Sequence, residues 1–186
     1  MRYKDLLIYL VLAVTPVAMQ RSEAQDQTAA GHETPAVMLR VMGGVGKPVE
    51  WSAQQVREQF AKEIQTVSYS SRGQKVESRC VSLIALLKAA GAEVDLKMGA
   101  GMEPGKKNHA IRLAVVVVSW DGYTATFSMA ELLPEVGGRK VWVALDADGK
   151  PFEEGEGHIR VISPEDKNLS RWVRDVGMVK VVDVSK

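Results

Sequence analysis

The sequence predicts an α+β domain with a mixed β-sheet and short helices. Segments with the alternating or continuous apolar pattern of strands outnumber the segments with helical periodicity. Gly-containing turns recur between neighbouring strand-like segments, as in antiparallel hairpins. Two serines are each followed three residues later by Gln or Glu, which is typical of capping boxes at helix starts. Together these patterns are typical of a sheet-rich α+β domain.

The first half of the predicted domain contains three strands and two helices. Strands are expected at residues 37–42, 66–70 and 74–80, with a turn at 43–48 and a hairpin turn at 71–73. Ser52 and Gln55 form the first capping box, and the helix that it starts is expected to run to about Lys62. A second helix is expected at 81–90, because leucines recur on one side of it, and Gly91 ends it.

The second half contains the most apolar strand of the chain. This strand is expected at 112–120 and carries the consecutive valines Val115–Val118, a run that predicts burial on both faces. Asp121 and Gly122 form a tight turn after it, and the second capping box starts a short helix at Ser128. Further strands are expected at 123–127, 140–145, 159–162 and 178–184, and a Gly-rich loop is expected at 98–108.

The N-terminus has the pattern of a secretory signal peptide. A basic start is followed by an apolar run from Leu6 to Met19 and by the small-x-small cleavage site Ser22-Glu23-Ala24. A membrane anchor is the alternative, but the run is shorter than the roughly 20 residues that span a bilayer. The sequence therefore predicts a signal peptide at 1–24, a polar linker at 25–36 and a single domain at 37–186. The protein is expected to be periplasmic or secreted, with no membrane span after cleavage.

Charge and cysteine content exclude two classes of protein. The formal net charge of the full chain is +1, and removal of residues 1–24 leaves equal numbers of basic and acidic residues. A nucleic-acid partner is not expected, because such proteins normally carry a basic excess. Cys80 is the single cysteine, which excludes a disulfide within the chain.

Short motifs for nucleotide and metal chemistry are incomplete. Gly46-Lys47 and Gly105-Lys106 both lack the preceding glycine and the following Ser or Thr of a phosphate-binding loop. The D-A-D-G sequence at 146–149 begins like a calcium loop but lacks the later ligands. No metal site is expected, because none of the histidines is followed by a second ligand three or four residues later: His32, His109 and His158.

Several motifs occur along the chain in a recognisable order. They are the turn Gly43–Pro48, the L-x-x-L-L-x-x-A-G helix from Leu83 to Gly91, Asp121-Gly122-Tyr123, the turn Asp148–Pro151, the segment Gly157–Pro164, and Arg171-Trp172. Their joint order resembles the sulfite-oxidase-type molybdopterin-binding domain, with this chain as a short, stand-alone, exported member. The resemblance implies the mixed-sheet fold of that domain and oxidoreductase chemistry with molybdopterin as the cofactor.

The resemblance also bears on Cys80. In catalytic members of the family, a cysteine thiolate and two pterin sulfurs hold the molybdenum, and that cysteine lies well before the leucine-rich helix. Cys80 lies only three residues ahead of Leu83, so it does not align with the metal ligand. The resemblance therefore implies a domain without the molybdenum ligand. Alternatively, Cys80 is a small, partly buried residue at a helix entrance.

Four residues are the candidates for cofactor or ligand binding: Arg160, Arg171, His158 and Cys80. A guanidinium group is the natural partner of a phosphate or a sulfur oxyanion, so both arginines are candidates to face an anion. The alternative for both is a surface salt bridge with Glu165, Asp166 or Asp175. His158 stands where the family usually has a proline. No catalytic residue is assigned.

Two main functions follow from these observations. The first is a binding or accessory module without the metal, which binds a small anionic ligand or a periplasmic protein partner. The second is a molybdopterin-dependent oxidoreductase subunit that uses Cys80 or a partner-supplied redox centre. A third is a sensor whose Gly99–Lys107 loop closes over a ligand. The tryptophans are expected in the core and strands, with a stacking platform for a ring as the alternative: Trp51, Trp120, Trp142 and Trp172.

Overall fold

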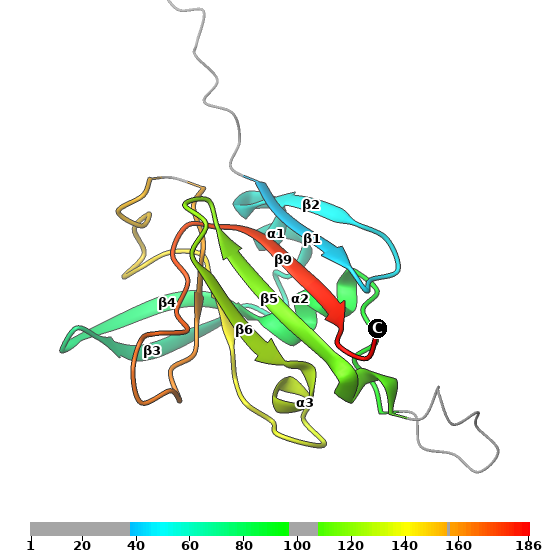
Figure 1. Ribbon diagram of the computed structural model, residues 1–186. Coiled ribbons are helices and arrows are strands. Elements are labelled where there is room, and N and C mark those ends of the chain that lie inside the picture. Colours follow the sequence, from blue (N-terminus) through cyan, green and yellow to red (C-terminus); the bar gives the residue numbers. More distant parts are fainter. Residues whose placement is uncertain (1–37, 97–107, 156) are drawn as a thin grey trace, which may run out of the picture. The chain divides into compact units, whose positions relative to one another are not determined.

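Two β-sheets form the domain in the computed structural model, which describes residues 38–96, 108–155 and 157–186 (Figure 1). The larger sheet has five strands in the order β2-β1-β9-β5-β6, and the smaller has four in the order β3-β4-β7-β8. The helices of the described residues are few and short. The expected α+β class with a mixed sheet is therefore confirmed. Residues Pro35–Lys186 form one compact unit.

The five-stranded sheet joins strands from both ends of the domain: β1 (Met38–Gly43), β2 (Val49–Ser52), β5 (Leu113–Ser119), β6 (Thr124–Ser128) and β9 (Val176–Asp183). β9 pairs parallel with β1 and antiparallel with β5, which makes the sheet mixed. Gly43 ends β1 with a φ of +90°, and a Cβ there would come within 2.1 Å of the carbonyl oxygen of Val181. The close approach of β1 to β9 thus requires a glycine at this position.

The four-stranded sheet is antiparallel and consists of β3 (Gln65–Ser71), β4 (Gln74–Ser82), β7 (Trp142–Ala144) and β8 (Arg160–Ile162). The expected hairpin between its first two strands is confirmed, with Arg72 and Gly73 in the turn at positive φ. Beyond β8, Val161 and Val173 exchange two backbone hydrogen bonds of 2.8 and 2.9 Å in an antiparallel bridge. The chain around Val173 therefore extends this sheet at its β8 edge.

The helices begin where the capping motifs predict. Both capping boxes are present, at the starts of α1 (Ala53–Gln59) and α3 (Met129–Leu132). The first helix ends at Gln59, with Phe60 as its C-cap, so the expected extension to Lys62 is wrong. The helix expected at 81–90 is shorter as well, because β4 continues to Ser82 and Ser82 then caps α2 (Leu83–Ala89). A short 3-10 helix, η2 (His109–Arg112), precedes β5.

The main core contains one face of each sheet and the leucines of α2. In β5, Leu113, Val115 and Val117 are buried, whereas Ala114, Val116 and Val118 are partly exposed. The prediction that this strand is buried on both faces is therefore wrong. The pleat turns alternate side chains to opposite faces of the sheet, and only one of these faces is fully covered.

A second, smaller cluster covers the other face of the four-stranded sheet. Its buried members are Tyr69, Cys80, Trp142, Ala144, Phe152 and Ile162, and Trp172 packs against them. Strand alternation explains the division, because Cys80 belongs to this cluster while its neighbour Val81 belongs to the main core. The candidate site lies over this second cluster.

Several expectations lie outside the described residues: the signal peptide at 1–24, the linker at 25–36 with His32, and most of the Gly-rich loop, including Gly99–Lys107. Among the residues that the structure does describe, no helix has the length and apolar character needed to cross a membrane.

Candidate functional site

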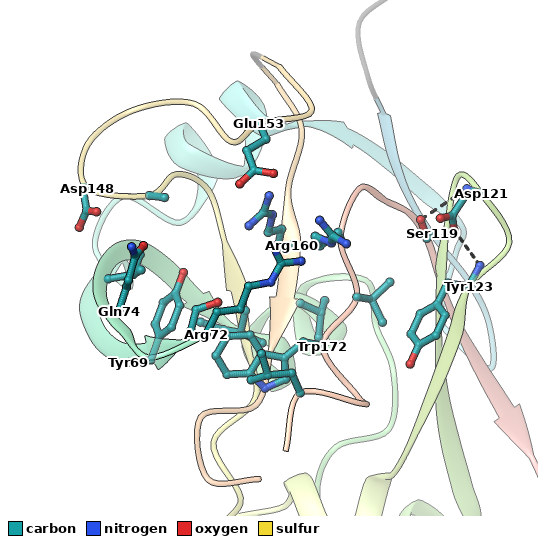
Figure 2. A pocket seen from close by; sticks show the side chains of 18 residues that line it. Tyr69, Arg72, Gln74, Ser119, Asp121, Tyr123, Asp148, Glu153, Arg160 and Trp172 are labelled. Atoms are coloured by element: carbon teal, nitrogen blue, oxygen red, sulfur yellow. Dashed lines mark hydrogen bonds between the residues drawn. The ribbon is translucent and has the colours of Figure 1, made fainter. Parts of the chain in front are cut away.

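A cavity of about 580 Å³ opens over the second cluster. Its wall is built by the β3–β4 hairpin, the β5–β6 turn, β8 and the segments on either side of β8. The polar lining includes three arginines and three carboxylates: Arg72, Arg160, Arg174, Asp121, Asp148 and Glu153. Figure 2 shows Asp121 and Tyr123 on one side of the cavity, Tyr69, Gln74 and Asp148 on the other, and Arg160 between them.

Two aromatic rings, Tyr69 and Trp172, contribute to the apolar part of the cavity lining. Tyr69 and Trp172 meet edge to face, with ring centroids 5.2 Å apart and an interplanar angle of 81°. The indole Nε1 of Trp172 donates a hydrogen bond of 2.9 Å to the carbonyl oxygen of Ser163, and the hydroxyls of Tyr69 and Ser78 lie 2.7 Å apart. These contacts hold both rings in place, so a bound ring or apolar group would meet a preorganised surface. Trp172 thus packs against the second cluster and also lines the cavity.

Arg160 lies on β8 and reaches into the cavity from the sheet. Its guanidinium carbon is 4.3 Å from the ring centroid of Phe152. Nη2 donates to both carboxylate oxygens of Glu154, at 3.0 and 2.7 Å, whereas Nε is buried and has no hydrogen-bond partner among the described residues. Burial acts to raise the pKa of Glu154, but the hydrogen bond from Arg160 and the charge of Arg174 help to bring it below its usual value. The salt-bridge alternative for Arg160 is therefore met, by Glu154 instead of the three acids that the sequence suggested.

Arg174 lies next to Arg160 in the extended sheet. The antiparallel bridge between Val161 and Val173 places Arg160 opposite Arg174 and Ile162 opposite Trp172. Like charges in directly opposite positions of two paired strands are destabilising. The pair therefore creates a local excess of positive charge that an anion can neutralise.

Arg72 supplies the third guanidinium from the tip of the β3–β4 hairpin. Figure 2 shows its side chain extending into the same region as that of Arg160. Within the described residues, neither Arg72 nor Arg174 makes a hydrogen bond or an ion pair. Both side chains are exposed at the cavity.

Two of the lining carboxylates serve turns. Asp121 accepts a hydrogen bond of 2.9 Å from the backbone N–H of Tyr123, and this bond lowers the pKa of its carboxyl group. Asp148 accepts one of 2.9 Å from the backbone N–H of Glu77. The backbone thus holds these two acids, while the guanidinium groups of Arg72 and Arg174 make no hydrogen bond or ion pair within the described residues.

His158 has a structural role, in a contact with Asp175. Its Nδ1 lies 2.5 Å from Oδ1 of Asp175, and the backbone N–H of Val176 donates to the carbonyl oxygen of Ile159 at 3.0 Å. His158 therefore helps to fasten the start of β9 to the start of β8. It is not among the described residues that line the cavity.

Arg171 belongs to a separate ion-pair network. Its guanidinium donates to Asp166 at 2.7 and 2.9 Å and to Glu131 at 3.0 and 3.2 Å, and Arg139 pairs with the same two carboxylates. It also lies 4.6 Å from the ring centroid of Phe127. The hydrogen bonds from Arg171 lower the pKa of Asp166. The predicted alternative for Arg171, a salt bridge with Asp166, is therefore confirmed. Arg171 is not among the described residues that line the cavity.

Cys80 lies inside β4 and is fully buried, so the partly buried position at a helix entrance is a wrong expectation. Its thiol donates to the carbonyl oxygen of Ser78 at 3.5 Å, and burial raises its pKa to about 12. A metal ligand must be a thiolate, which this environment disfavours. Among the described residues, no group of three His, Cys, Asp or Glu is arranged to hold a metal ion. The surroundings of Cys80 therefore do not fit the molybdenum ligand of the sulfite-oxidase-type domain.

His109 is held away from the cavity. Its Nδ1 lies 2.9 Å from Glu93 and its Nε2 lies 3.0 Å from Asp183, and the two carboxylates raise the pKa of the imidazole. The bonds tie the segment after α2 to the end of β9. The sequence leaves the role of His109 open, and in the structure its imidazole links Glu93 to Asp183.

Comparison with known proteins does not identify a family. No protein-family model matches the chain, and a search of curated proteins finds no match. The resemblance to the sulfite-oxidase-type domain therefore stays a prediction.

Sequence reasoning missed Arg72, Arg174 and Glu154. The signal for Arg72 was its place in the Ser71-Arg72-Gly73 turn, since an exposed cation at a hairpin tip is free to face a ligand. Arg174 is separated from Arg160 by a long connection, and only the bridge at Val173 brings the two together. Glu154 stands beside Glu153 in a turn, and acids in turns are usually solvated, so the sequence gives no signal for its contact with Arg160.

Proposed function

We propose that this domain is a binding module for a small anionic ligand, which it holds in the arginine-lined cavity without using Cys80 as a metal ligand. We further propose that the protein is exported and acts in the periplasm or outside the cell. The observation that carries the binding function is the meeting of Arg72, Arg160 and Arg174 around one cavity.

The chemistry of the lining favours an oxyanion. Guanidinium groups bind carboxylate and phosphate oxygens through charge-assisted hydrogen bonds that are roughly twice as strong as neutral ones. The volume of about 580 Å³ falls in the range of small-molecule sites, about 300–1,000 Å³. Tyr69 and Trp172 add an apolar wall. A ligand with one oxyanion group and one ring or apolar part would use both halves of the cavity.

The first test is a titration of the protein with phenyl phosphate, followed by calorimetry and tryptophan fluorescence. Loss of one charged hydrogen-bond donor costs about 1.5–3 kcal/mol, so Arg72→Gln and Arg174→Gln are each expected to weaken binding about tenfold or more. Lys75→Gln is the matched control, because Lys75 lies on the same hairpin but pairs with Glu77 outside the cavity. Equal loss in all three variants, or no binding of phenyl phosphate at millimolar concentration, would contradict the proposal.

The second test addresses the oxidoreductase alternative. The protein is purified from a host that makes the molybdenum cofactor, and its molybdenum and pterin contents are measured. We expect neither at a stoichiometric level. About one molybdenum per chain, lost in Cys80→Ser, would overturn the proposal. Sequencing the N-terminus of the same sample tests export, because cleavage after Ala24 is expected.

A further inference from the structure

We infer that Glu154 is an internal ligand of the anion site: its carboxylate occupies the position at Arg160 that a carboxylate or phosphate group of the bound ligand takes over. This inference rests on the proposed anion-binding function and adds a built-in competitor to it. It also assigns the ligand class, since only a group that can replace a carboxylate on a guanidinium can open the site.

The pairing of Glu154 with Arg160 is incomplete, which leaves room for a better ligand. Both carboxylate oxygens contact the same nitrogen, Nη2, at 3.0 and 2.7 Å. The neighbouring Nε is buried without an acceptor among the described residues. A guanidinium group binds an oxyanion best through two parallel N–H donors, and a buried donor without an acceptor is unfavourable. An oxyanion that spans Nε and Nη2 would satisfy both donors of Arg160.

The charges around Arg160 also indicate that Glu154 takes the place of an anionic ligand. Arg160 and Arg174 are opposite neighbours across the bridge at Val173, and the charges of both act on the carboxylate of Glu154. Glu154 thus offsets, from within the chain, one of the two positive charges of this arginine pair. When its carboxylate moves away, the positive charge of both arginines is available to a ligand that carries at least one full negative charge.

The local backbone allows Glu154 to leave without disturbing β8. Glu154 lies in the segment between β7 and β8, which makes a tight turn closed by a bridge between Phe152 and Gly155. Gly155 and Gly157 follow it with φ of +121° and +85°, conformations that glycine adopts without strain. Rotation within this turn can move the carboxylate of Glu154, while Arg160 stays fixed in the sheet by its strand neighbours.

The competition has a measurable size. A charge-assisted pair in a partly buried setting favours the closed arrangement by about tenfold or more, and the apparent Kd of the ligand rises by the same factor. Glu154→Gln keeps the length of the side chain but removes its charge. We therefore expect Glu154→Gln to bind phenyl phosphate about tenfold more tightly than the unchanged protein.

Glu153→Gln is the matched control, because Glu153 is the preceding acid, lines the cavity and makes no ion pair within the described residues. Removal of its charge acts only through solvent and is expected to change the affinity about twofold to threefold. The gain in Glu154→Gln should disappear when Arg160→Gln is added, since the competitor then has no partner. Glu154→Asp serves as a second variant if Glu154→Gln does not fold, because it keeps the charge, shortens the reach, and should give a smaller gain.

The outcomes separate this inference from the function on which it rests. If the unchanged protein binds phenyl phosphate through Arg72 and Arg174, but Glu154→Gln binds no more tightly than Glu153→Gln, the internal ligand is refuted and the anion site stands. If neither the protein nor Glu154→Gln binds phenyl phosphate, the proposed function itself is refuted. Phenol is titrated in parallel, and equal binding of this neutral ring would refute the role of the oxyanion.

Discussion

Cys80 is expected to resist thiol reagents in the folded protein, and the size of this protection can be worked from its surroundings. Burial raises its pKa from an ordinary 9.0 to about 12. At pH 8 the thiolate fraction is then about a thousandfold smaller, although the greater nucleophilicity of a more basic thiolate returns roughly thirtyfold of that loss. The side chain is also fully buried. If exposure needs an opening of about 5 kcal/mol, the low end of domain stability, reaction slows by roughly 5,000-fold. The inaccessibility of the thiol to the reagent therefore slows the reaction more than its raised pKa does.

The assay is the rate of reaction with an aromatic disulfide reagent at pH 8, in native buffer and in denaturant. We expect the native rate to be at least about a thousandfold lower than the denatured rate. Cys80→Ser controls for reagent hydrolysis, since it removes the only thiol. A native rate within about tenfold of the denatured rate would show that the thiol is accessible. It would also restore Cys80 as a candidate metal ligand and weaken the proposed function.

Two further predictions concern groups outside the cavity. Arg171→Met removes one cation from a partly buried network, and is expected to lower the free energy of unfolding by about 1–3 kcal/mol in denaturant titrations. The affinity for phenyl phosphate should stay unchanged, and a matching loss of affinity would place Arg171 in the site after all. Because the pKa of His109 is raised in the folded state, its stabilising effect is complete below the unfolded pKa of about 6.5 and is lost as pH rises through the folded value. Stability should therefore fall with increasing pH above about 6.5, by at most about 1.4 kcal/mol per pH unit for one proton. His109→Gln should flatten this slope, and an unaltered slope would show that another group causes it.

The local elements of the fold could be predicted because their signals are local. Both capping boxes involve residues three apart, and the β3–β4 turn needs only Arg72 and Gly73. The β4–α2 boundary was harder, because Val81 and Ser82 suit either a strand or a helix start. Ser82 belongs to the strand because it pairs with Trp142 on the neighbouring strand β7. The sequence around Ser82 gives no sign of this long-range pairing.

This boundary also explains why the environment of Cys80 was missed. With a helix from residue 81, Cys80 would be a partly buried residue at the helix entrance. With a strand to Ser82, the two-residue alternation places Cys80 on the outer face and Val81 on the core face. The outer face would normally be exposed, but Phe152 and Trp172 cover it. A shift of two residues in one boundary therefore changes the expected chemistry of the thiol.

The motifs that carried the family resemblance gain a different meaning in the folded protein. The turn at Asp121-Gly122-Tyr123, the turn beginning at Asp148, the strand residue Arg160 and the ring of Trp172 come from four separate motifs. Their side chains line one cavity.

In the sequence, the order of these motifs predicted only a fold. In the structure, residues from all four motifs line the same cavity. Arg171, which belongs to the same motif as Trp172, points to a structural ion-pair network instead. Cys80, the residue on which metal chemistry would depend, is not among the described residues that line the cavity. A cavity lined by three arginines beside a fully buried thiol supports the proposed binding of an anion without a metal. The variants Arg72→Gln and Arg174→Gln test that binding, and Glu154→Gln separately tests the competition within the chain.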